Sequence, residues 1–168
     1  MKRKIAFLIL SIIVLYFFYS PLVIELNDTK RFSEFSFKPN QTFDLNNILD
    51  LESKENVTVY IVLNSEERKY FSIEIPKWKV LKTDKRVLIK DLLNCKFQYT
   101  DSDVSTIQSK LYIYSGDELV FESNISLEEK NLGFQNSYIG WVSSIDDNNL
   151  LKIIKQFDRY NLPFLIID

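Results

Sequence analysis

The sequence predicts an N-terminal transmembrane helix followed by a mainly-β extracytoplasmic domain, sandwich-like or α+β, with one amphipathic helix near its C-terminus. Three observations lead to this fold class. Residues 5–24 carry no charged side chain, several later stretches are rich in β-branched and aromatic residues, and one late stretch has apolar residues at helical spacing. We therefore expect an anchor at residues 1–26 and a single domain at residues 27–168.

The uncharged run at residues 5–24 has the length of a membrane span. As a helix it would measure about 30 Å, the thickness of a bilayer's hydrocarbon core. Lys2, Arg3 and Lys4 precede it, which predicts a cytoplasmic N-terminus and a periplasmic or extracellular domain. Cleavage as a signal peptide is disfavoured, because Phe18 and Pro21 flank the only small residue near its end. The expected partner of this run is the lipid bilayer.

The composition of the domain excludes some classes of partner and constraint. The whole chain has a net charge of −2, and the domain is more acidic than that once its basic start is set aside, so we expect no nucleic acid partner. The single cysteine, Cys95, cannot form an intrachain disulfide. It is expected to be a small apolar core residue, and the alternative is an intermolecular disulfide.

Two β-hairpins are predicted inside the domain. Residues 57–63 are the strongest strand and have two apolar faces, which indicates a central position in a sheet. Residues 70–75 alternate apolar and polar side chains, so we expect a hairpin near residues 57–75. A second hairpin is expected near residues 111–122, where Gly116 can adopt the positive φ of a tight turn. A first strand is expected at residues 30–39, and the alternative is a juxtamembrane ribbon whose aromatic side chains touch the bilayer surface.

The remaining segments are assigned more simply. Residues 41–51 are expected to be a loop with one helical turn, and residues 122–132 a long connection. Strands are expected at residues 96–99 and 134–142. Residues 87–93 contain apolar side chains without a firm period.

The last forty residues predict a helix and a final strand. Apolar residues at helical spacing indicate an amphipathic helix near residues 146–160; they are Leu150, Leu151, Ile153, Ile154 and Phe157. The apolar residues 164–167 are expected to form the last strand. This helix either belongs to a right-handed crossover between two strands or lies across one end of a sandwich.

A basic stretch between residues 77 and 90 is the one candidate surface for a partner or for lipid. Its members are Lys77, Trp78, Lys79, Lys82, Lys85 and Arg86. A basic aromatic stretch near a membrane can bind lipid head groups or an anionic glycan. The alternative is an edge strand protected by lysines and followed by a turn at residues 83–85, with acidic neighbours as the local partners of these charges.

The residue types available exclude several kinds of catalysis. The chain has no histidine, which excludes Ser-His-Asp and Cys-His catalysis and removes the usual zinc ligands. Asp101, Asp103 and Ser105 resemble the start of a calcium loop, but Thr106 and Tyr112 stand where that loop requires glycine and glutamate. We predict no catalytic residue, no cofactor and no metal site.

These observations favour a non-enzymatic, membrane-anchored binding or assembly module of a bacterial cell envelope, with a protein partner. One alternative is a periplasmic inhibitor, such as an immunity protein that neutralises a toxin. A second alternative is a carboxylate-dependent hydrolase, because paired carboxylates can meet in three dimensions without a sequence pattern.

Overall fold

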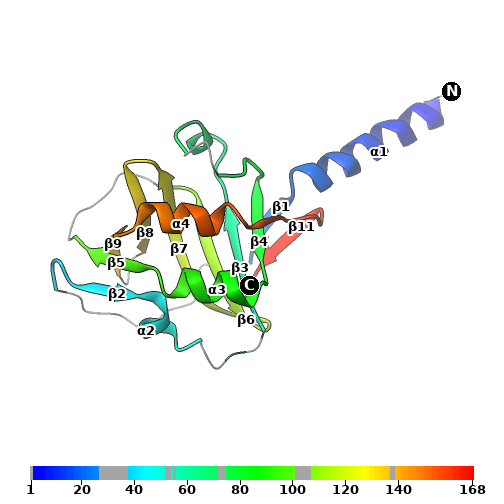
Figure 1. The fold of residues 1–168 in the computed structure, drawn as a ribbon. Coiled ribbons are helices and arrows are strands. Elements are labelled where there is room, and N and C mark those ends of the chain that lie inside the picture. Colours follow the sequence, from blue (N-terminus) through cyan, green and yellow to red (C-terminus); the bar gives the residue numbers. More distant parts are fainter. Residues whose placement is uncertain are drawn as a thin grey trace.

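The computed structural model of the chain describes residues 2–26, 38–51, 54, 56–71, 75–100, 107–136 and 139–168. The fold is mainly β with a few helices, as predicted: a nine-stranded sheet, a two-stranded sheet and helices (Figure 1). The expected strand at residues 30–39 and the calcium-like residues 101–106 lie wholly or almost wholly outside the described residues.

The nine-stranded sheet is antiparallel throughout and strongly curled. Its strands, in spatial order, are β10 (Asp158–Arg159), β4 (Val80–Thr83), β3 (Val57–Val62), β6 (Lys110–Ser115), β7 (Glu118–Glu128), β8 (Asn131–Asn136), β9 (Gly140–Ser144), β5 (Lys96–Tyr99) and β2 (Thr42–Asp44). The direction of the strands changes along the sheet, so that β2 and β5 cross the direction of β3 and β4 (Figure 1).

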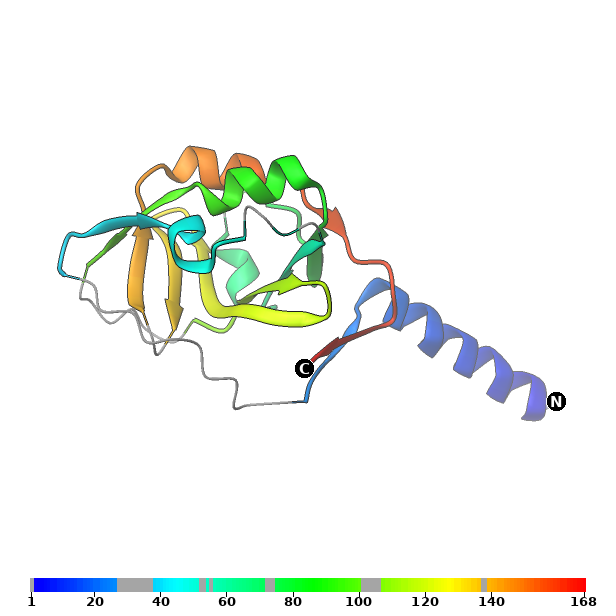
Figure 2. The same cartoon turned by 90° about the horizontal axis from the view of Figure 1, so that it is seen from below.

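The other elements lie on the two faces of this sheet. The helices are α1 (Lys2–Tyr19), α2 (Leu45–Leu49), α3 (Arg86–Leu93) and α4 (Asp147–Ile154), with a 3₁₀ turn, η1 (Glu67–Lys69). Helices α3 and α4 lie side by side over one face (Figure 2). The two-stranded sheet pairs β1 (Leu22–Glu25) with β11 (Phe164–Ile167) in parallel, and we call it the ribbon.

The sheet separates two apolar clusters. The main core lies under α3 and α4 and includes Leu92 and Ile154, at 1% and 0% exposure. The second core lies under the ribbon, where Leu165 and Ile167 meet side chains of β4, β6 and β7. The central strand β3 serves both, since Val59 and Ile61 belong to the main core and Tyr60 and Val62 pack against the second. This explains the two apolar faces in its sequence.

The two expected hairpins have different outcomes. β6 and β7 form the hairpin expected near residues 111–122, and Gly116, in the turn between them, has a φ of 63°. The hairpin at residues 57–75 is wrong, because β3 pairs with β4 instead. Phe71 bridges to Glu128 of β7, and both Phe71 and Ile75 are buried in the main core. These two apolar residues are therefore core residues outside β3 and β4, and the residues between them, 72–74, lie outside the described part of the chain.

The helix predicted over residues 5–24 is wrong in its extent. Helix α1 ends at Tyr19, and Leu22–Glu25 form β1. Pro21 has no backbone N–H and restricts the residue before it, which explains the break. Within the described part of the chain, no helix combines the length and the apolar character needed to cross a membrane.

The C-terminal region also differs from expectation. α4 ends at Ile154, and β10 takes up Asp158–Arg159, so the helix is shorter than residues 146–160. Its start is capped by Asp146, whose side chain accepts a hydrogen bond from the amide of Asn149 at 3.0 Å. β11 pairs with β1 and not with a strand of the large sheet, so the strand, helix and strand do not form a crossover.

Three further segments were assigned wrongly. Residues 122–132 are not a connection, because β7 runs to Glu128 and turns directly into β8. The strand at residues 134–142 is two strands, β8 and β9, and Gly140 at the start of β9 has a φ of 73°. Residues 86–93 form α3, with Leu88, Ile89, Leu92 and Leu93 buried. These four residues have the i, i+4 spacing of a helix face.

The thiol of Cys95 is buried, at 5% exposure, beside Leu92 and Phe97 in the main core cluster. Burial raises the pKa of the Cys95 thiol to about 12. Its Sγ lies 3.4 Å from the carbonyl oxygen of Asp91. The side chain is therefore placed as the expected core residue, out of reach of a second chain.

Substitutions on the buried and exposed faces of α4 should have different effects on the stability of the fold. Ile154 is fully buried, so Ile154→Ala should lower the free energy of unfolding by about 2–5 kcal/mol. Lys152 is exposed on the same helix, so Lys152→Ala should change it by less than about 0.5 kcal/mol. Urea unfolding followed by tryptophan fluorescence measures both. Equal midpoints for the two variants would contradict the packing of α4 on the sheet.

Candidate functional site at the junction of helix and domain

The ribbon joins α1 to the domain. Its four residue pairs run from Leu22 with Phe164 to Glu25 with Ile167, and two flanking backbone hydrogen bonds extend it. Alternate side chains point to opposite faces of a strand. Leu165 and Ile167 are buried against the second core, at 4% and 3% exposure. The ribbon thus holds the end of α1 against the large sheet, as seen in Figure 1.

A cation–aromatic cluster lies at the end of α1. Its members, Tyr19, Trp78 and Arg159, are called the junction cluster. The Arg159 guanidinium lies 5.0 Å from the ring centre of Tyr19 and 4.5 Å from that of Trp78, distances at which a cation is attracted to an aromatic face. The rings of Tyr19 and Trp78 meet edge to face at 5.7 Å. One cation therefore connects the helix to β10 and to the segment before β4.

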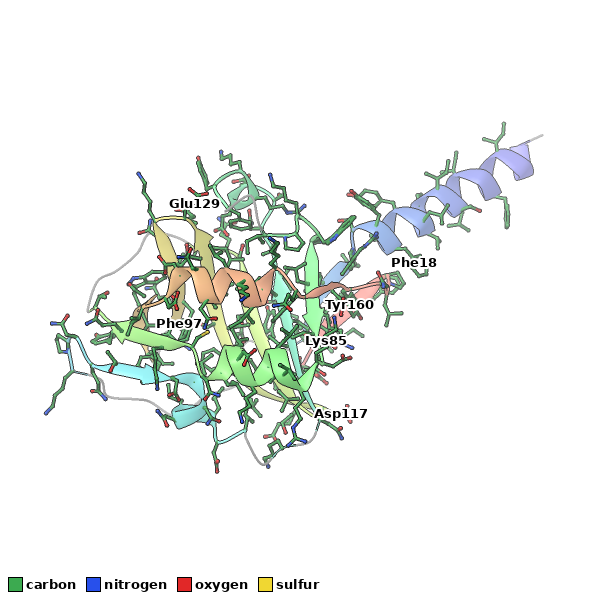
Figure 3. The ribbon with its side chains drawn as sticks, in the orientation of Figure 1. Phe18, Lys85, Phe97, Asp117, Glu129 and Tyr160 are labelled. Atoms are coloured by element: carbon green, nitrogen blue, oxygen red, sulfur yellow. The ribbon has the colours of Figure 1, made fainter. Side chains whose placement is uncertain are left out.

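The same arginine caps the last turn of α1. Its Nη2 donates a hydrogen bond to the carbonyl oxygen of Phe18, one of the last four carbonyls of the helix. A cation is favoured at this end of a helix because the macrodipole is negative there. Figure 3 shows Phe18 at the end of α1 nearest the domain and Tyr160 at the neighbouring edge. The hydroxyl of Tyr160 donates to the carbonyl oxygen of Phe164 at 2.7 Å, which ties this edge to the ribbon.

A partly exposed carboxylate, that of Glu25, fixes the other end of β1. The Glu25 carboxylate accepts hydrogen bonds from the Tyr112 hydroxyl and from the Lys110 ammonium, both at 2.8 Å. Burial raises the pKa of Glu25, but the hydrogen bonds from Lys110 and Tyr112 outweigh it and leave that pKa below its usual value. Burial lowers the pKa of Lys110, yet Glu25 and Glu122 raise it above its usual value overall. Both charges are therefore stabilised in the folded chain.

The outer face of the ribbon and the surface of α1 are apolar and exposed. Phe164 and Ile166 are 50% and 54% exposed on this face, next to Leu22 at 40%. Phe17 of α1 stacks on Phe164 with ring centres 6.1 Å apart, so the two surfaces are continuous. The exposed large apolar side chains of α1 are Ile5, Phe7, Ile9, Leu10, Ile12, Ile13, Val14, Leu15, Tyr16, Phe18 and Tyr19.

The basic stretch chosen from the sequence is dispersed over different places. Trp78 belongs to the junction cluster, and the carbonyl oxygen of Lys77 accepts a hydrogen bond from Arg68 at 3.3 Å. Lys82 pairs with Asp84 at 2.9 Å and Lys85 with Asp158 at 2.8 Å, so local acids take up these charges. Arg86 lies further on, at the start of α3. Lys79 lies before β4, and its carbonyl oxygen accepts from the Leu63 amide.

The alternative for this stretch is a lysine-protected strand near the edge of a sheet, with acidic neighbours as local partners. The structure is closer to this alternative than to a single basic surface. β4 lies one strand from the edge, covered only by the two residues of β10. Sequence reasoning missed Arg159 and Glu25, the residues that organise the junction. No local pattern marks them, because their partners come from distant parts of the chain.

Removing the Arg159 side chain should loosen the junction. Arg159→Ala removes one hydrogen bond to a helix carbonyl and two cation–π contacts, which together contribute about 1–2 kcal/mol at a half-buried site. We expect a lower urea midpoint, faster amide exchange at residues 16–20 and an altered Trp78 emission.

The matched control is Arg86→Ala, which removes an exposed arginine at the start of α3. It should leave exchange in α1 unchanged. Equal exchange at residues 16–20 in both variants would show that Arg159 does not hold the helix end.

The ribbon should be sensitive to acid through Glu25. Its folded pKa lies below the unfolded one, so its stabilisation is present above about pH 5 and is lost as the pH falls through the folded value. Glu25→Gln should therefore lower the urea midpoint at pH 7, and the gap to the unchanged protein should shrink towards pH 3. Tyr112→Phe removes one hydrogen-bond donor to Glu25. The difference in urea midpoint between this variant and the unchanged protein should likewise shrink as the pH falls. A gap that is constant with pH would contradict this role.

No family model matches the chain, and neither a curated protein nor a solved structure matches it.

Proposed function

We propose that this chain is a membrane-anchored, extracytoplasmic binding module of a cell envelope, with α1 as its anchor. The observation that carries the proposal is the apolar surface of α1, a helix that projects from the domain (Figures 1 and 2) and has eleven large apolar side chains with 42–72% exposure. Soluble proteins rarely expose a contiguous apolar surface of this extent, and one of this kind marks a membrane or protein contact.

The continuation of this surface onto the ribbon supports the bilayer as its partner. The uncharged part of α1, Ile5–Tyr19, has 15 residues and a length of about 22 Å, clearly less than a hydrocarbon core. A short helix is accommodated by local thinning of the bilayer and by its flanking residues. The outer face of the ribbon, with Phe164 and Ile166, lies beside the helix end and extends the apolar area at the level of the bilayer surface.

The junction cluster suits the membrane–water interface. Tyrosine and tryptophan are enriched at this depth because their rings have an apolar body and a polar edge. Arg159, which holds Tyr19 and Trp78 together, has a charged head and would meet head groups there. The three basic residues at the start of α1 favour a cytoplasmic N-terminus, with the β-rich domain on the outer side.

Two features support a binding role for the domain: the residue types of the chain, and the attachment of the domain to α1 through the ribbon. Without histidine, the common acid–base and nucleophilic triads are not available, whereas a rigid ribbon is suited to presenting a surface to a protein partner at a set distance from a membrane. The outer side of the cytoplasmic membrane is the proposed location.

Charges in α1 should abolish membrane association. Leu10 and Ile13 are 58% and 47% exposed, so Leu10→Arg with Ile13→Arg should leave the domain folded. Each arginine at the centre of a membrane helix costs about 2.5–3.5 kcal/mol on insertion scales. The purified chain should float with phosphatidylcholine–phosphatidylglycerol liposomes, and this double variant should not.

The matched control places two arginines on exposed apolar positions of the domain, Val87→Arg with Ile145→Arg, at 71% and 53% exposure. It should float like the unchanged chain. Equal flotation of both double variants would overturn the anchor. A reporter active only in the cytoplasm, fused after Asp168, should be silent, and its activity would overturn the orientation.

A further inference from the structure

A basic pocket lies on the domain, away from the junction. It has a volume of about 180 Å³ and lies among α2, α3, the start of β3 and the segments before β3 and α3. In both views α2 lies on the opposite side of the domain from α1 (Figures 1 and 2). The α2 side of the pocket is therefore remote from α1, whereas Asp84 and Arg86 flank Lys85, which pairs with Asp158 beside the junction.

Three cations line this pocket. They are Lys54, Arg86 and Lys90, and none of them forms an ion pair with a described residue. One carboxylate, Asp84, also lines it. Lys82 holds Asp84 at 2.9 Å, and this hydrogen bond lowers the pKa of Asp84, so its charge is already compensated. Among the described residues, the lining thus has more positive than negative charge, and its three cations have no ion-pair partner there.

The floor of the pocket is apolar. Leu51, Val57, Ile89 and Leu93 line it, and each is at most 7% exposed. Asn46 stands on the wall, and its Oδ1 is buried with no hydrogen-bond partner among the described atoms. A buried acceptor needs a donor, which water can supply beside an anionic ligand. An apolar floor below a few convergent polar groups is the usual make-up of a small-molecule site.

We propose that this pocket binds a small organic anion, with a carboxylate or phosphate head on a short apolar body. The head meets Lys54, Arg86 and Lys90, and the body lies against Ile89 and Leu93. The volume equals that of about six water molecules, which suits a small head and a short body better than a drug-sized ligand. The proposal goes beyond the anchoring function and does not depend on it.

Butyrate is the test ligand, and its neutral isostere butyramide is the control. The full chain in a nonionic detergent is titrated with each, and amide shifts are followed by ¹H–¹⁵N correlation spectra. We expect saturable butyrate shifts confined to α3, α2 and the start of β3, with a millimolar Kd. Butyramide should bind at least about tenfold more weakly, because it lacks the charge. Inorganic phosphate should also bind more weakly, because it lacks the apolar body.

Variants separate the pocket from general charge. Lys90→Gln and Arg86→Gln should each weaken butyrate binding by about five- to tenfold, while the rest of the spectrum stays unchanged. Lys152→Gln removes an exposed lysine of the neighbouring helix α4 and should leave the Kd unchanged. Equal binding of butyrate and butyramide, equal weakening by Lys152→Gln, shifts outside these elements or no saturable shift would each overturn the proposal. Loss of liposome binding by the α1 variant leaves these expectations in place.

Discussion

The pairing of β1 with β11 is the interaction on which the arrangement of this molecule depends. It joins the residues that follow α1 to residues almost a whole domain later in the chain. This pairing places Leu165 and Ile167 over the second face of the large sheet, which would otherwise expose tyrosine and aliphatic side chains to water. It also brings Phe18 within reach of Arg159 and Glu25 within reach of Tyr112. The parallel pairing of β1 with β11 therefore sets the position of the end of α1, the cover of the second core and the contacts of the junction.

The large sheet acts as a partition between two apolar regions of unequal size. The helices cover the larger region, and the ribbon covers the smaller one. Three tyrosines, Tyr60, Tyr114 and Tyr160, meet edge to face in the smaller region. Burial raises the pKa of each of these phenols, because the charged form would have to leave water. The smaller region therefore holds phenol groups within an apolar cluster, under a cover that is only two strands wide.

The sequence was informative where the pattern was local. The apolar faces of residues 57–63 and the Gly116 turn correspond to β3 and to the β6–β7 hairpin. Local patterns failed where a long-range partner decided the outcome. Leu22–Glu25 continue an apolar run, yet they form a strand because β11 is available to pair with them. Lys82 and Lys85 stand close in sequence, but Asp84 and Asp158 engage them separately. Arg159 is unremarkable until folding brings Trp78 and Tyr19 to it.

The separation between β1 and β11 along the chain has a consequence for the order of synthesis. Residues 22–25 leave the ribosome long before residues 164–167, so the ribbon is the last part of the fold that can close. Until then, the aromatic face of β3 and β6 has no cover, and the segment after α1 has no strand partner. A chaperone or a translocation channel that shields these two surfaces during synthesis would protect the chain at the stage when an unpaired strand edge can join another molecule.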